Sequence, residues 1–204
     1  MTNTFTVDQG LFKQSYPLIQ VTTVHARDIE RDTLLTFLKT GSGKGAIGVS
    51  AIYGQRCAIT SISFATLASA LVIQFGKQHG KRALTLVKEC ILTNPHYTKY
   101  AFKMDAFSLS LFTDLSLRIS NAVDLLSSRT TGDRDSFGTL MEVMGGERKL
   151  HRERVKTLFK DVKKISPSDV ARQAWAAYLV AITNNTASIP RIDTSKLTRK
   201  ARFP

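Results

Sequence analysis

The chain has 204 residues, of which 29 are Lys or Arg and 16 are Asp or Glu, and its formal net charge is +13. This excess goes beyond incidental surface charge, so nucleic acid or an anionic membrane is the expected class of partner. The length and the 43% of hydrophobic residues allow one domain or two small lobes. Two cysteines without a CxxC pair argue against a disulfide scaffold and against a zinc site.

Residues 1–25 are expected to form an extended N-terminal arm. Apolar side chains are scattered there among polar ones, with Pro17 and little helical period. No secretory signal is visible, which predicts an intracellular protein. An apolar strip of this size is disfavoured on the surface of a monomer, so the arm is expected to lie on a neighbouring subunit. The arm residues expected to make that oligomeric contact are Phe5, Val7, Leu11 and Phe12.

The next elements are a helix, a strand and two further helices. An amphipathic helix is predicted at 27–39, and alternation of apolar with small residues predicts a short β element near 46–54. The uncharged stretch 57–76 is long enough to suggest a membrane span, but its Ser and Thr content favours a buried helix at 59–75. Another helix is predicted at 81–92.

The second half of the chain is predicted to be helical at 105–126, at 136–144 and at 147–165. A last helix at 167–183 has a strong start signal, with Ser166 as N-cap and a proline in the first position. The tail from 186 has no period and is expected to be a second arm. Its apolar residues expected to contact a neighbouring subunit are Ile189, Ile192, Leu197 and Phe203.

The helix at 147–165 has the clearest functional pattern, because its basic and apolar side chains fall on opposite faces. A solvated surface helix would show the same pattern, but the charge of the whole chain favours RNA. Its candidate RNA-binding residues are Lys149, Arg152, Lys156, Lys160 and Lys163.

A second basic region, 81–103, is interleaved with aromatic residues and forms the candidate opposite wall of an RNA cleft. Cationic groups neutralise phosphates and rings stack on unpaired bases, although these rings could instead cap the core. The candidates are Lys81, Arg82, Lys88, Lys99 and Lys103, the rings of Tyr97 and Tyr100, and Lys44 and Arg56 beside the expected strand.

No motif indicates catalysis. The run Gly41–Gly45 fails as a phosphate-binding loop, because Leu38 and Gly45 stand where that loop needs Gly and Ser or Thr. Asp133 and Asp135 are interpreted as solvating a loop and capping the next helix. The histidines show no metal-binding spacing, and no serine lies in a nucleophile motif. We therefore expect no catalytic residue, no metal, no cofactor and no enzymatic activity.

Residues 46–103 resemble the nucleocapsid proteins of segmented negative-strand RNA viruses, the bunyaviruses of the tomato spotted wilt and Bunyamwera types. The resemblance consists of a strand, an uncharged apolar helix, a basic linker and the segment 87–95, VKECILTNP. It implies a two-lobed, mostly helical fold with a positive cleft for genomic RNA and with arms that dock on neighbouring subunits. It also implies a location in the virion and the host cytoplasm.

The sequence therefore predicts a mostly α protein with an N-terminal arm (1–25), two lobes (26–103 and 104–185) and a C-terminal arm (186–204). Its expected function is to encapsidate single-stranded RNA without sequence preference and to polymerise through its arms. The expected partners are RNA, further copies of the chain and a viral RNA polymerase, and a membrane partner is not expected. The alternatives are a DNA-binding or nucleoid-packing protein and a basic matrix or scaffold protein on an anionic membrane.

Overall fold

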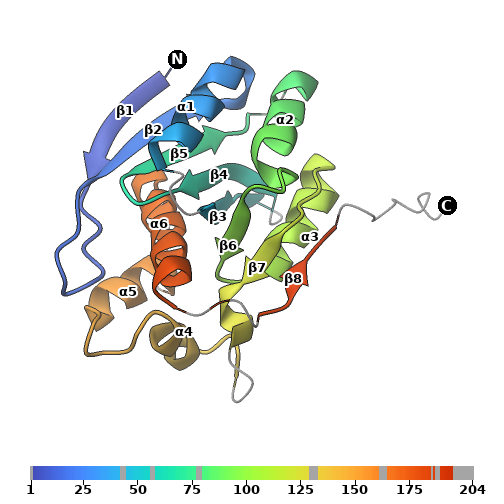
Figure 1. Ribbon diagram of the computed structural model, residues 1–204. Helices are drawn as coiled ribbons and strands as arrows, with labels where there is room; N and C mark the ends of the chain where they lie inside the picture. Colours follow the sequence, from blue (N-terminus) through green and yellow to red (C-terminus); the bar gives the residue numbers. More distant parts are fainter. Residues whose placement is uncertain are drawn as a thin grey trace.

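A mixed β-sheet runs through the computed structural model (Figure 1). The structure describes residues 2–41, 45–55, 58–76, 80–128, 133–160, 165–184, 186 and 189–194. Within these ranges the strands are β1 (Thr2–Val7), β2 (Ile19–His25), β3 (Ala46–Tyr53), β4 (Ile59–Ala65), β5 (Ser69–Gln74), β6 (Thr98–Ala101), β7 (Ala122–Asp124) and β8 (Arg191–Ile192).

The helices within the same ranges are α1 (Arg31–Gly41), α2 (Lys81–Val87), α3 (Met104–Leu115), α4 (Phe137–Val143), α5 (Arg152–Phe159) and α6 (Pro167–Thr183). Short 3-10 turns lie at Ala26–Asp28 and Leu125–Ser128, and a π-helical turn, Lys88–Leu92, continues α2. Figure 1 shows α4 and α5 together at the lower end of the molecule.

The strand order is β1-β2-β5-β4-β3-β6-β7-β8. Strands β3, β4 and β5 form an antiparallel meander, whereas β6 pairs in parallel with β3, and β7 pairs in parallel with β6. The chain therefore leaves β3 toward β4 on one side and later returns on its other side as β6. The carboxyl ends of β3, β6 and β7 meet at one edge of the sheet.

Two apolar cores lie on the two faces of the sheet. One contains buried residues of α1, α2 and α3, and the other contains buried residues of α4, α5 and α6. Side chains of β3 divide between them, with Ile47 and Val49 in the first core and Ile52 packed against the second. Burial on both faces stabilises the central strands and explains why they are rich in apolar residues.

Helix α6 packs unusually close to β3 at Gly48. A Cβ atom placed on Gly48 would lie 1.9 Å from the carbonyl oxygen of Ala174 and 2.5 Å from the amide nitrogen of Tyr178. Only glycine permits this approach of two backbones. The contact seats Trp175 fully in the core, where its indole N–H donates to the carbonyl oxygen of Leu67.

The mostly α, two-lobed fold predicted from the sequence is wrong, because the structure is α/β with an eight-stranded sheet. The segment predicted as a buried helix at 59–75 is the antiparallel pair β4 and β5. A strand buried on both faces is a continuous apolar run, which periodicity does not distinguish from a buried helix. No helix in the described part of the chain is long and apolar enough to cross a membrane.

The predicted helix at 105–126 is also too long. Helix α3 ends at Leu115, where Ser116 takes a left-handed backbone conformation with φ of 55°. The chain then enters β7, and the pairing of β6 with β7 crosses the boundary expected between the two lobes. The basic helix predicted at 147–165 is the shorter α5, and 161–164 lie outside the described residues.

The two predicted arms are corrected as well, because both pair with the chain's own sheet through β1, β2 and β8. Apolar side chains expected to dock on a neighbour pack in the chain's own cores, and neither the fold nor these contacts support polymerisation. Val7, Leu11, Phe12 and Ile189 are buried, Phe5 and Ile192 are partly buried, and Leu197 and Phe203 lie outside the described residues.

Other elements agree with the sequence. Strand β3 lies where the short β element was predicted, and α4 and α6 closely match the helices predicted at 136–144 and 167–183. The start of α6 is a complete capping box: Ser166 Oγ accepts from the backbone N–H of Asp169, and the Asp169 carboxylate accepts from the N–H of Ser166. These signals are local, so they are readable without tertiary context.

The Gly48→Ala variant should lose about 3 kcal/mol or more of unfolding free energy, because the added methyl group forces α6 away from β3. Gly138→Ala in α4 is the matched control, since its Cβ would meet only Ser136 Oγ at 3.7 Å. The control should be as stable as the unmodified chain or slightly more stable. Urea unfolding measures both, and equal stability of the two variants would contradict the close-packing argument.

Candidate functional site

A cavity of about 590 Å³ opens beside the carboxyl ends of β3 and β6. Its walls come from β3, the segment 101–103, the first half of α3, the segment 135–140, the end of α5 and Gln173 of α6. In open α/β sheets, ligands bind outside the carboxyl ends of strands where the strand order reverses. The reversal between β3 and β6 places this cavity, called the candidate pocket below, at that position.

Aromatic rings form much of the wall of the candidate pocket. Phe102 and Phe159 meet edge to face, with ring centroids 5.4 Å apart, and they join β6 to the end of α5. The ring of Phe137 lines another part, and the Arg152 guanidinium lies over it at 5.6 Å from the centroid. These contacts bring the basic helix α5 to the pocket edge through apolar and cation–π packing.

The polar groups on the sheet side of the pocket are neutral. Ser50 Oγ donates to Gln173 Oε1 at 2.8 Å, and Gln173 Nε2 donates to the carbonyl oxygen of Leu158 at 2.8 Å. The pair links β3, α6 and α5, and both side chains line the pocket. The amide keeps one N–H and the hydroxyl keeps lone pairs for a ligand.

Two lysines line the pocket, Lys103 and Lys160. Lys103 is the N-cap of α3 and has a left-handed φ of 62°, a strained conformation for a residue with a side chain. Its ammonium group pairs with Asp135 at 3.1 Å and its side chain is 54% exposed. Lys160 follows the last residue of α5 and is exposed. Among the described lining residues, one carboxylate stands against two ammonium groups, an excess of positive charge.

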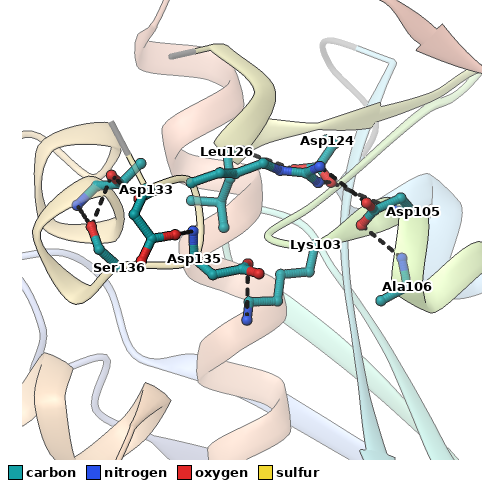
Figure 2. Close-up of polar contacts among 10 residues, drawn as sticks. Lys103, Asp105, Ala106, Asp124, Leu126, Asp133, Asp135 and Ser136 are labelled. Atoms are coloured by element: carbon teal, nitrogen blue, oxygen red, sulfur yellow. Dashed lines mark hydrogen bonds and ion pairs between the residues drawn. The ribbon is translucent and has the colours of Figure 1, made fainter. Parts of the chain in front are cut away.

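A charged cluster lies beside the pocket (Figure 2). The Arg134 guanidinium donates to the carboxylates of both Asp105, at 3.0 Å, and Asp124. The Asp124 side chain is only 2% exposed, and its other oxygen accepts from the backbone N–H of Leu126 at 2.9 Å. Arg134 therefore compensates a buried negative charge and joins the start of α3 to the end of β7.

The two carboxyl groups of this cluster titrate in opposite directions. Burial raises the pKa of Asp124 above its ordinary value. For Asp105, partial burial acts in the same direction, but the Ala106 N–H and the Arg134 guanidinium outweigh it and lower the pKa. Two interacting carboxyl groups on one cation are expected to separate in this way.

The segment 133–136 carries Arg134 and forms part of the pocket wall. Asp133 Oδ1 accepts from the Asp135 N–H at 3.0 Å, and Ser136 Oγ caps α4 by accepting from the Thr139 N–H at 3.1 Å. The interpretation of Asp133 and Asp135 as loop residues is therefore confirmed, although Ser136 makes the cap (Figure 2). Within the ranges described above, no group of three or more His, Cys, Asp or Glu side chains is placed to hold a metal ion.

Of the predicted RNA-binding residues that the structure describes, Lys103 and Lys160 line the pocket. Those on α5 and just before it are exposed or half-buried beside it, whereas Lys81, Arg82 and Lys88 lie on α2 and its continuation. The α2 residues therefore do not form an opposite wall of this pocket. Lys44, Arg56 and Lys163 lie outside the described residues.

The rings of Tyr97 and Tyr100 are partly buried against the two apolar cores, which agrees with the core-capping alternative. Sequence reasoning missed the pocket residues Ser50, Gln173 and Phe137. Ser50 and Gln173 lie 123 residues apart in the chain, and no spacing rule connects them.

Lys99, a predicted RNA contact, is fully buried instead. Its ammonium group donates to the carbonyl oxygens of Tyr97 at 2.7 Å and Asn94 at 3.1 Å. Burial lowers the pKa of Lys99 from 10.5 to about 8. This lysine holds the turn before β6 and is closed to a ligand.

Comparison of the sequence with protein-family models and with curated proteins gives no match. Among solved structures, the chain is similar to Trypanosoma brucei RNase D in complex with GMP, with 13% identity, a TM-score of 0.52 and coverage of 84% of this chain and 57% of that one. Another structure of Trypanosoma brucei RNase D is similar with 14% identity and a TM-score of 0.53, and that match covers 82% of this chain and 64% of the other.

Escherichia coli RNase D, described as an exoribonuclease involved in structured RNA processing, is similar with 15% identity and a TM-score of 0.52. That match covers 81% of this chain and 43% of the other. The chain thus spans roughly half the length of these proteins, between 43% and 64%. At these identities the matches show the fold, which is the α/β fold of RNase D.

This fold overturns the resemblance to bunyavirus nucleocapsid proteins and, with it, the encapsidation function and the viral partners. The DNA-packing and matrix-protein alternatives do not fit it either. The expectation of no enzymatic activity is contradicted as well, because the matched structures include an exoribonuclease. Missing motifs were a poor ground for that expectation, since a catalytic site is assembled from residues that are distant in sequence.

The strain at Lys103 predicts that Lys103→Gly stabilises the fold by about 1 kcal/mol, because glycine adopts the left-handed conformation without cost. The exposed ion pair with Asp135 contributes little to stability, so its loss does not offset this gain. Lys103→Ala, which removes the same ion pair but keeps the strain, is the control and should not be stabilised. Thermal unfolding of the two variants decides the matter, and equal midpoints would contradict the prediction.

The buried Lys99 predicts a pH dependence of stability. The unfolded chain binds the Lys99 proton more tightly than the folded chain, so the unfolding free energy should rise between about pH 8 and pH 10.5. Relative to Lys99→Met, the rise should be at most roughly 3 kcal/mol. Urea unfolding across this range measures it, with Lys39→Met, an exposed lysine of α1, as the control that keeps the rise. A wild-type curve parallel to that of Lys99→Met would contradict it.

Proposed function

We propose that this chain is an RNA-binding domain with the RNase D fold and that it receives the end of a single-stranded RNA in the candidate pocket. The observation that carries the proposal is the pocket itself, which combines aromatic walls with Lys103 and Lys160 where this sheet topology places ligands. Rings stack on unpaired bases and ammonium groups neutralise phosphates, so the lining fits a terminal nucleotide.

Helix α5 supplies the path that leads to the pocket. Lys160 follows its last turn and lines the pocket, while Arg152 and Lys156 extend the basic surface along the helix, and Lys149 precedes it. Phosphates of the nucleotides next to the bound end would lie along this surface. The basic face of α5, which predicts an RNA partner from the sequence, would then form one side of the entrance to the pocket.

The remaining support is independent of the pocket. The net charge of +13 favours a polyanion. A structure similar in fold, Trypanosoma brucei RNase D, is described as a complex with GMP, which is a single ribonucleotide. A pocket of about 590 Å³ has a size suited to one small ligand.

Cleavage of the bound RNA is the second candidate function. The observation that favours it is the fold, since Escherichia coli RNase D is described as an exoribonuclease. Binding of the RNA end is the step that both candidates share. The binding experiment therefore includes a denaturing gel of the same labelled RNA, with and without Mg²⁺ and Mn²⁺.

Fluorescence anisotropy with a labelled single-stranded RNA of about ten nucleotides tests the proposal. Lys103→Ala and Lys160→Ala should each weaken binding, and each lost phosphate contact should flatten the slope of log K against log salt by about 0.7. Lys39→Ala removes the same charge from α1, which does not line the pocket, and should bind like the unmodified chain.

Equal loss in all three variants would show that RNA binds by diffuse surface charge, and it would contradict the pocket. So would binding that is unaffected by Lys103→Ala and Lys160→Ala together. Shortening of the RNA on the gel, lost in the same two variants, would add cleavage to binding.

A further inference from the structure

Three carboxylates in or beside the pocket wall, those of Asp105, Asp124 and Asp135, each pair with a cation of the chain. Arg134 pairs with Asp105 and Asp124, and Lys103 pairs with Asp135. Sites that cleave phosphodiesters with divalent metal ions hold those ions with several carboxylates. Here Asp105, Asp124 and Asp135 already have Arg134 or Lys103 as a partner, and the polar pair on the sheet side of the pocket, Ser50 and Gln173, is neutral. These residues do not fit a divalent ion.

Arg134 performs two tasks in this arrangement. Its planar guanidinium presents several N–H groups, so one side chain reaches carboxylates on two elements, Asp105 of α3 and Asp124 of β7. Without it, Asp124 would be a buried charge without a partner, which is strongly destabilising.

The second task concerns the pocket wall. Arg134 is followed directly by Asp135, Ser136 and Phe137, all of which line the pocket. The two ion pairs of Arg134 tie this segment to α3 and β7. The Lys103–Asp135 pair is a further link between the segment and the start of α3 (Figure 2). Because Asp135 and Phe137 follow Arg134 directly, we expect these ion pairs to help position the Phe137 ring and the Lys103 ammonium group.

We propose that Arg134 is a positioning residue that takes the charge-neutralising place of a divalent cation, so that RNA binding in this pocket requires Arg134 and no divalent ion. The proposal rests on the proposed function, because it concerns the same pocket. Arg134 does not line the pocket, and it acts through the wall segment and through Asp105 and Asp124.

The first arm of the test uses the unmodified chain with the same labelled RNA, in EDTA and in Mg²⁺ or Mn²⁺ at constant ionic strength. The dissociation constant should stay within about twofold. Binding that requires a divalent ion would overturn the proposal while leaving the proposed function intact. Absence of RNA binding under every condition would instead refute the proposed function.

The second arm compares Arg134→Gln with Arg172→Gln. Arg172 is a matched control, since it pairs with Asp169 at 3.2 Å, is 30% exposed against 38% for Arg134, and lies outside the pocket lining. Both variants lose one positive charge. Arg134→Gln should weaken RNA binding by about tenfold or more, and Arg172→Gln should change it little. Arg134→Lys, which keeps the charge but not the fork, should be intermediate.

A response to metal separates charge neutralisation from a merely structural role. In Arg134→Gln the carboxylates of Asp105 and Asp124 lose their cation, so Mg²⁺ or Mn²⁺ should restore part of the RNA affinity, and they should not do so in Arg172→Gln. Equal losses in the two variants, or no response to metal in folded Arg134→Gln, would overturn the proposal. If circular dichroism shows that Arg134→Gln is unfolded, Arg134→Lys and the first arm decide it.

Discussion

The contact between Gly48 and the backbone of α6 fixes how this helix lies on the sheet. Because two backbones touch there without a side chain between them, α6 has one position on β3. That position sets Gln173 against Ser50, and Gln173 Nε2 in turn holds the end of α5 by donating to the carbonyl oxygen of Leu158. The candidate pocket is the space that this packing leaves beside the strand ends.

Neutral and charged groups occupy different parts of the pocket and its surroundings. Neutral side chains, Ser50 and Gln173, lie on the sheet side of the pocket, while the lysines lie where solvent reaches them. The carboxylates of Asp105 and Asp124 pair with Arg134, and that of Asp135, which lines the pocket, pairs with Lys103. The surface offered to an RNA phosphate is therefore positive, although acidic residues are close by.

Sequence reasoning succeeded where the signal is local. The capping box of α6, the helix α4 and the alternation in β3 are all readable within one short window. It failed at β4 and β5, which are buried on both faces and read as one long apolar helix. The resemblance to nucleocapsid proteins depended on that predicted helix, so the error in fold class also led to the wrong function, RNA encapsidation.

The candidate site was predictable only in part for the same reason. The basic face of α5 is a local pattern, so Lys160 was found, and Lys103 was found among the basic residues near β6. Lys99 belongs to the same group of basic residues near β6, but it is buried. The alternation of β6 turns its side chain inward, and the prediction of a helix and a loop around 81–103 contained no such strand. Ser50, Gln173 and Arg134 carry no pattern, since tertiary packing alone assembles their contacts.

The large sequence separation between residues that meet at the pocket has a consequence for the order in which the fold forms. Ser50 and Gln173 are 123 residues apart, and Phe12 pairs across a similarly long loop with Leu150, next to α5. Closing such long loops costs conformational entropy before the contacts between their ends can form and stabilise the fold. On the ribosome, the β3–β5 meander can pair early, but its α6 face stays uncovered until α6 has emerged. The surface that would receive RNA is thus among the last parts to form, and a truncated nascent chain has the sheet without the pocket.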